Sequence, residues 1–169
     1  MKKNFISITC SLITLLLVVL TLPQPAEGAS QVSQLSDSHV TSEYIEHLED
    51  GSYFHVTISE EETSFLSRSV QTKSGSRKTT YYNANGTALW DFTVYGTFQY
   101  TPGSSAACTS SSYSFNIYDN SWENSYASAN KSGNQAIGDA TFNEKVFLIA
   151  TNIRDVHLVL TCSAYGTLS

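Results

Sequence analysis

The feature that most restricts the fold of this 169-residue chain is the alternation of polar and apolar residues over 87–100 (TALWDFTVYGTFQY). Successive side chains of a β-strand point to opposite faces of a sheet, so a two-residue period predicts one long, half-buried strand. The residues expected on its buried face are Ala88, Trp90, Phe92, Val94, Phe98 and Tyr100. Asn85-Gly86 precedes the strand and predicts a hairpin turn, because both residues tolerate a positive φ.

Further segments with a strand-like pattern follow residue 100, and turn residues separate them. We expect strands at 107–118, 122–130, 134–143 and 155–165. The last should turn inward Val156, Leu158, Leu160, Cys162 and Ala164. The first should turn inward Tyr113, Phe115 and Ile117, and Cys108 joins them only if a bulge falls within 110–112. About five strands, joined by Gly, Asn and Pro turns, predict an all-β fold, an antiparallel β-sandwich of the immunoglobulin-like kind.

The first 28 residues have the order of a secretory signal. Two lysines precede an apolar run at 5–22, and small residues follow it, with cleavage expected before Ala29. The competing interpretation is an uncleaved membrane anchor, since the run is close to the length that spans a bilayer. Serine and threonine dilute the run, which favours cleavage. We therefore expect a signal helix at 1–28 and a protein secreted to the medium or held at the cell surface.

The charge of the chain is uneven. Removing the signal takes the formal net charge from −6 to −7, because Lys2, Lys3 and Glu27 leave with it. Residues 29–62 hold eight acids and no Lys or Arg. We expect 29–75 to be an acidic, largely flexible leader, with helical turns near 43–50, a candidate edge strand at 53–59 and a linker at 72–76. The β-sandwich domain should then span 76–169. Nothing in this charge pattern predicts a nucleic-acid partner or stable membrane insertion after signal removal.

Two cysteines, Cys108 and Cys162, remain after signal removal. An even number of cysteines in an exported chain predicts a disulfide, and two cysteines allow one pairing. The alternative is a pair of separate buried thiols, which is the usual state in a reducing compartment.

No motif in the sequence specifies a reaction. The four histidines lack metal-ligand spacing, and no serine lies in a nucleophile elbow. His157 could face Asp91, Asp139 or Asp155 as part of a catalytic group, and the sequence does not choose among them. We therefore expect no catalytic residue, no metal site and no cofactor.

The expected outer face of the strand at 87–100 is the best candidate for binding. Leu89 and Tyr95 interrupt an otherwise polar face, and Asp91 and Thr93 lie between them. Such a strip suits a sugar or an extended partner strand. The competing interpretation is that a second sheet, or the strand at 53–59, covers this face and makes Leu89 and Tyr95 part of the core.

Several segments after residue 77 resemble an uncharacterised family of small exported proteins of Gram-positive bacteria, a domain of unknown function. The segments that carry the resemblance are 78–83 (KTTYYN), 85–86 (NG), 88–90 (ALW), Val94 with 96–98 (GTF), 108–110 (CTS), 128–133 (SANKSG) and 159–169 (VLTCSAYGTLS). The acidic segment 48–53 (LEDGSY) is similar as well. The resemblance implies a shared disulfide and no known active site.

Three functions are compatible with these observations. The first is an exported, non-enzymatic interaction module whose partner is a protein or glycan at the cell surface. The second is a secreted bacteriocin-like effector or toxin, and the third is a small secreted hydrolase. Membrane-active chains are usually cationic and amphipathic, whereas this one is acidic. The first function is therefore the leading hypothesis.

Overall fold

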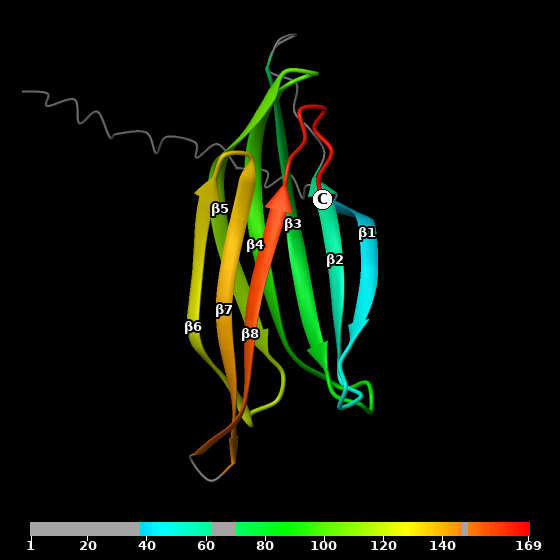
Figure 1. The fold of residues 1–169 in the computed structure, drawn as a ribbon, viewed down its shortest axis with the longest axis vertical. Helices are drawn as coiled ribbons and strands as arrows, with labels where there is room; N and C mark the ends of the chain where they lie inside the picture. Colours follow the sequence, from blue (N-terminus) through cyan, green and yellow to red (C-terminus); the bar gives the residue numbers. More distant parts are fainter. Residues whose placement is uncertain (1–37, 62–69, 147–148) are drawn as a thin grey trace, which may run out of the picture. The chain divides into compact units, whose positions relative to one another are not determined.

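Eight antiparallel strands make up most of the described chain. The structure, a computed structural model, describes residues 38–61, 70–146 and 149–169. The strands are β1 (Ser38–His47), β2 (Tyr53–Glu61), β3 (Gln71–Tyr82), β4 (Ala88–Thr101), β5 (Ser105–Ile117), β6 (Trp122–Ser132), β7 (Gln135–Val146) and β8 (Ile149–Thr161). They form two layers, as Figure 1 shows. The predicted signal at 1–28 lies outside the described residues. No helix able to span a membrane occurs within the described ranges.

Each sheet is a meander in which every strand pairs with its neighbour in sequence. The larger sheet has the order β1-β2-β3-β4-β5, and the smaller has the order β6-β7-β8. The described chain therefore crosses between the layers at one place, from β5 to β6 (Figure 1). This confirms the all-β fold with two antiparallel sheets. The prediction of an immunoglobulin-like connectivity is wrong. That fold distributes successive strands between its two sheets, whereas here each sheet is built from consecutive strands.

The core lies between the two sheets and is centred on an aromatic pair. Trp90 of β4 stacks on Phe142 of β7, with ring centroids 4.0 Å apart and ring planes 7° from parallel. Both side chains are fully buried, as are Phe92, Val94 and Phe98. The predicted inner face of β4 is thus confirmed from Trp90 to Tyr100, whereas Ala88 is only half-buried. Of the residues expected inward on a strand at 155–165, Val156, Leu158, Leu160 and Cys162 are buried. The strand itself is β8 at Ile149–Thr161, so Cys162 and the half-buried Ala164 follow its end.

Part of the predicted leader belongs to the larger sheet. Residues 43–50, expected to form helical turns, lie mainly in β1. The strand expected at 53–59 is β2, but it lies inside the sheet between β1 and β3. The boundary expected at residue 76 falls within β3, and the described residues on both sides of it belong to one compact unit.

The segment 72–76 (TKSGS), expected to be a linker, lies in β3, and its glycine is explained by close packing. Gly75 lies so close to the Leu168 side chain and to the Ser59 carbonyl that a Cβ would collide with both. Glycine here permits close packing rather than flexibility.

The bulge expected beside Cys108 is present, one residue before the expected range. Phe98 pairs with Cys108 and Thr97 with Ser110, so Thr109 is the additional residue. Cys108 is buried as a result, and so is Cys162; both are free thiols in this structure. Tyr113 and Phe115, expected in the core, are 41% and 40% exposed, because β5 lies at the margin of the two layers.

Candidate functional site

Three of the four predicted strip residues, Asp91, Thr93 and Tyr95, lie on the outer face of the larger sheet, away from the smaller one. Register brings side chains from four strands into cross-strand rows on this face. One row, from β2 to β5, consists of Thr57, Lys78, Thr93 and Ser114. The next row consists of Ser59, Ser76, Tyr95 and Ser112. Hydroxyl groups therefore follow one another across the sheet.

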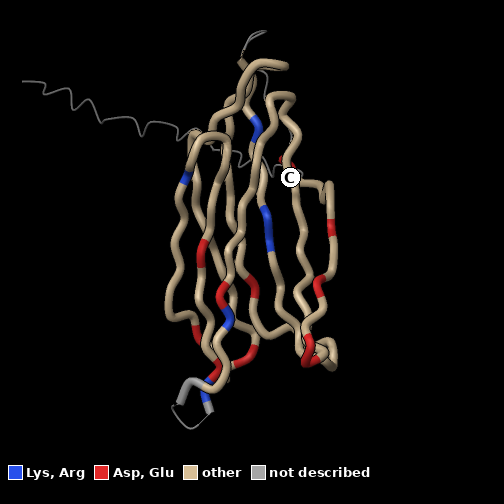
Figure 2. The backbone as a smooth tube through the Cα atoms, viewed as in Figure 1, with Lys and Arg blue, Asp and Glu red and all other residues tan. Residues whose placement is uncertain are grey.

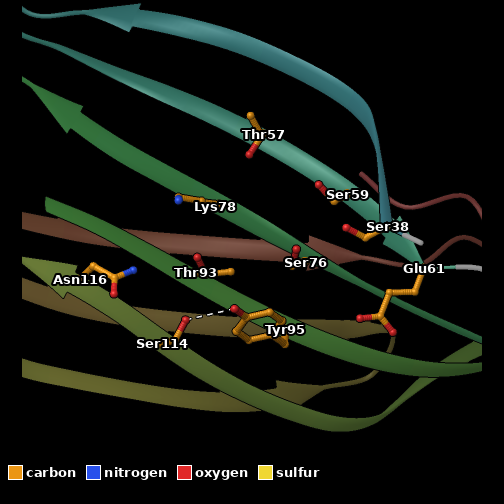
Figure 3. Close-up of a pocket in the computed structure, with 10 residues that line it drawn as sticks. All are labelled: Ser38, Thr57, Ser59, Glu61, Ser76, Lys78, Thr93, Tyr95, Ser114 and Asn116. Carbon is orange, nitrogen blue, oxygen red and sulfur yellow. Dashed lines mark hydrogen bonds between the residues drawn. The ribbon is translucent and has the colours of Figure 1, made fainter. Parts of the chain in front are cut away.

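These rows line a shallow groove of about 270 Å³. Figure 3 shows its lining residues, which come from five neighbouring strands. They are Ser38, Thr57, Ser59, Glu61, Ser76, Lys78, Thr93, Tyr95, Ser114 and Asn116. Six of the ten are serine or threonine, and these hydroxyls can both donate and accept hydrogen bonds. We refer to this feature as the hydroxyl groove.

Tyr95 supplies the aromatic surface of the hydroxyl groove. Its side chain is 41% exposed, although β4 lies near the middle of the sheet. Its hydroxyl lies 3.1 Å from Oγ of Ser114, and the dashed line in Figure 3 marks this contact. A ring held at its tip and open on its face can stack against a ligand.

Asp91 lies beside the hydroxyl groove and is fully buried. Its carboxylate accepts hydrogen bonds from Nδ2 of Asn116 at 3.0 and 3.2 Å and from the Tyr118 hydroxyl, and pairs with Nζ of Lys78 at 2.8 Å. Burial raises the pKa of Asp91, but the hydrogen bonds from Lys78, Tyr118 and Asn116 outweigh it and hold the pKa below its usual value. Asp91 therefore acts as a charged anchor for three neighbouring side chains.

The same contact fixes the charge of Lys78. Burial lowers the pKa of this ammonium group, but the hydrogen bond and the charge of Asp91 raise it above its ordinary value. Lys78 stays charged at neutral pH and its charge is balanced by Asp91. Glu61 is the other ionisable residue that lines the groove. The groove therefore presents mainly neutral hydrogen-bonding groups.

The four predicted strip residues do not share one environment. Tyr95 is exposed as expected, whereas Thr93 is 6% exposed and Asp91 is fully covered by its partners. Leu89 is the unpaired residue where the register shifts between Tyr81 and Tyr82, and it belongs to the hydrophobic core. The strip interpretation was therefore wrong for Leu89, because a bulge breaks the two-residue period there.

One histidine–carboxylate pair is present on the smaller sheet. Nδ1 of His157 lies 2.6 Å from Oδ1 of Asp139, and both side chains are substantially exposed. The sequence left Asp91, Asp139 and Asp155 open as partners, and the structure places Asp139 at that position. Asp155 instead accepts a hydrogen bond from the Thr141 hydroxyl at 2.8 Å. Among the described residues, no group of three or more His, Cys, Asp or Glu side chains is arranged to hold a metal ion.

The sequence interpretation missed Lys78 and Asn116 as parts of the site. Lys78 follows a segment expected to be a linker, and Asn116 lies on a strand considered only for its inward residues. A usable signal was present in the outward positions. Polar residues recur at 76, 78 and 80 and again at 110, 112, 114 and 116. These strands, β3 and β5, flank β4, so polar outer positions on both predict one polar surface across the three strands.

Comparison of the chain with protein-family models, with curated proteins and with solved structures gives no match.

Proposed function

We propose that the protein is an exported, non-enzymatic binding module whose hydroxyl groove holds a stretch of a neutral glycan. The observation that carries this proposal is the combination of six serine or threonine residues with one exposed tyrosine on a single sheet face. Sugars present hydroxyl groups at their edges and apolar C–H groups on their ring faces. The serine and threonine hydroxyls can bond to the sugar hydroxyls, and the Tyr95 ring can stack on the apolar ring face.

The shape and charge of the groove support a chain-like ligand. It is shallow and crosses several strands, so a ligand can lie along it without being enclosed (Figure 3). Lys78 and Asp91 neutralise each other, so Glu61 is the one described lining residue that adds a net charge, and that charge disfavours an anionic ligand. Asn116 adds an amide at one end, where its Nδ2 group is engaged by Asp91 and its Oδ1 can accept a hydrogen bond. These properties favour a neutral polysaccharide over an anionic polymer.

The test is titration of the purified protein with neutral hexasaccharides of glucose and of N-acetylglucosamine, followed by calorimetry. Substituting Tyr95→Ser should weaken binding about fivefold, since stacking against a tyrosine ring contributes about 1 kcal/mol. Tyr126→Ser is the matched control, because Tyr126 is 55% exposed on the smaller sheet. Loss of binding in both variants, or in neither, would contradict the assignment of this groove.

We also propose that export joins Cys108 and Cys162 in a disulfide. Their N–H groups donate to two consecutive carbonyls, Gly133 at 2.8 Å and Asn134 at 3.0 Å. The two cysteines therefore flank one turn, the β6–β7 turn, and come from different sheets. A disulfide here would tie the sheets together and add about 4 kcal/mol by the chain-entropy model.

The pairing is tested by thiol labelling of exported protein under denaturing conditions without reductant. Denaturation is needed because burial raises the pKa of Cys162 to about 11, so a folded free thiol would react slowly. We expect no label before reduction and two labels after it. Two labels before reduction would show that the cysteines are unpaired.

A further inference from the structure

The edge of the larger sheet at β1 differs from the other strand edges of the described chain. At the opposite edge, β5 is joined to the smaller sheet, since the Cys108 N–H donates to the Gly133 carbonyl and Nζ of Lys131 lies 2.7 Å from the Thr109 carbonyl. On the edge of β8, the Arg77 guanidinium donates to the Val159 carbonyl at 2.8 Å. Thr161 exchanges two backbone hydrogen bonds with Ser169.

By contrast, β1 pairs with β2 on one side and leaves its other side open within the described structure. All ten of its residues are exposed. Figure 1 shows it at the margin of the larger sheet, away from β6, β7 and β8. Three large apolar side chains are exposed along it, Val40 at 56%, Tyr44 at 43% and Ile45 at 54%. Alternate residues of an edge strand direct N–H and C=O groups outward, where another strand can pair with them.

The formally charged residues of β1 and β2 are all acidic, although Arg77 of β3 reaches the Tyr44 hydroxyl and Nε2 of His55 lies 3.5 Å from Oε2 of Glu43. Residues 38–61, which span β1 and β2, hold six acids and no Lys or Arg. Two of these acids, Glu43 and Glu46, lie on β1, and its exposed Tyr44 and Ile45 stand between them. Figure 2 shows acidic positions and no basic ones along this edge strand. Opposite charges directly across a strand pair stabilise it, and like charges destabilise it.

We propose that β1 is a docking edge for an extended, basic peptide segment of another protein, which adds a strand to the larger sheet. The residues across from 43–46 should read basic, apolar, apolar, basic. Each basic side chain would then face Glu43 or Glu46, and the two apolar side chains would cover Tyr44 and Ile45. The hydroxyl of Tyr44 is already held by Arg77 at 2.7 Å, which fixes the position of its ring.

A second copy of this chain fits the edge less well. Its β5 and β6 edges contact each other through Thr109 and Lys131, and its β8 edge carries contacts at Val159 and Thr161, so the pairing to compare is β1 with β1. Two β1 strands would bring together acidic segments that hold no Lys or Arg. Glu43 and Glu46 therefore oppose self-association while they attract a basic strand.

The probe is an end-blocked peptide, Thr-Lys-Val-Val-Lys-Thr, added to the isotope-labelled protein and followed by NMR. We expect chemical-shift changes concentrated in 42–47, with a dissociation constant of roughly 0.1–1 mM for so small an interface. Glu43→Gln combined with Glu46→Gln should weaken binding about fivefold through the loss of two cross-strand charge pairs. The matched control combines Glu123→Gln with Glu144→Gln, which removes the same charge from the smaller sheet.

Two further peptides separate strand pairing from charge attraction alone. Replacing the first valine by proline keeps the charge but removes an N–H donor, and binding should be lost. Replacing both lysines by glutamate should also abolish binding. Equal binding of the proline peptide, shift changes centred outside β1, or no binding at millimolar concentration would each overturn the proposal. The same holds for a wild-type protein that dimerises through β1 in sedimentation experiments.

Discussion

Replacing Asp91 by asparagine should destabilise the protein by about 2–4 kcal/mol at neutral pH. The carboxylate of Asp91 is surrounded by donors from Lys78, Asn116 and Tyr118. An asparagine side chain has the same size, but its NH₂ group would face donors in place of an acceptor. Each hydrogen bond to a charged group contributes about 1.5–3 kcal/mol.

The expected loss of stability is smaller than the sum of the three hydrogen bonds, because water can solvate the released partners of Asp91. The Lys78 side chain is 39% exposed and Tyr118 is 53% exposed, so both can be solvated after the substitution. The expected loss therefore stays below that of a fully buried ion pair, which is about 3–5 kcal/mol. Lys78→Met tests the other side of the pair. A double-mutant cycle of Asp91→Asn with Lys78→Met should give a coupling energy of about 1–2 kcal/mol.

The assay is urea unfolding followed by tryptophan fluorescence, at a series of pH values. The pKa of Asp91 is lowered in the folded protein. Its contribution is therefore present above its unfolded pKa of about 3.9 and is lost as the pH falls through the folded pKa. The difference between wild type and Asp91→Asn should be constant from about pH 5 to pH 8 and shrink below about pH 4. Asp155→Asn, on an exposed residue, is the control. A difference under about 0.5 kcal/mol at pH 7, within the range of ordinary surface substitutions, would refute the anchoring role.

Three other substitutions give separate expectations in the same unfolding assay. Phe142→Ala should cost about 3–5 kcal/mol, because it removes the fully buried ring that stacks on Trp90. Gly166→Ala should cost at least about 2 kcal/mol, because Gly166 has φ +79° and a Cβ would collide with the Tyr100 ring. Tyr95→Ser should change stability by less than about 1 kcal/mol, because its ring is 41% exposed. A loss above about 2 kcal/mol for Tyr95→Ser would mark a buried aromatic residue and remove the basis for stacking.

The strands after residue 85 were predictable because each combines a two-residue period with a strong turn signal. Asn85-Gly86 is an example, since Gly86 has φ +78° and its N–H closes the turn on the Asn83 carbonyl at 2.9 Å. The hairpin between β6 and β7 was likewise expected around residues 131–133, and the strands meet there. In these segments local sequence and tertiary packing demand the same conformation.

The first three strands were harder to predict because their stability comes from neighbours distant in sequence. Residues 43–50 contain helix-compatible glutamates and leucine, yet most of them lie in β1, which is held by pairing with β2. Gly75 lies in the middle of β3 opposite Gly96 of β4, so backbone approach rather than propensity decides its conformation. Strand propensity depends strongly on such context, and a single sequence does not reveal it.

The two candidate sites have a common origin in the unequal size of the sheets. Three strands cover one face of a five-stranded sheet, so the outer face and the β1 edge of the larger sheet are left open within the described structure. On the outer face, hydroxyl groups and the Lys78–Asp91 ion pair replace apolar side chains that would promote aggregation. On the β1 edge, Glu43 and Glu46 oppose pairing with a like-charged strand. The same polar and acidic side chains that oppose aggregation also determine which ligands each surface can bind. A neutral polar face suits a sugar chain, and an acidic edge suits a basic strand. Because different residues carry these two surfaces, Tyr95→Ser should leave peptide binding unchanged, and the Glu43→Gln, Glu46→Gln variant should leave glycan binding unchanged.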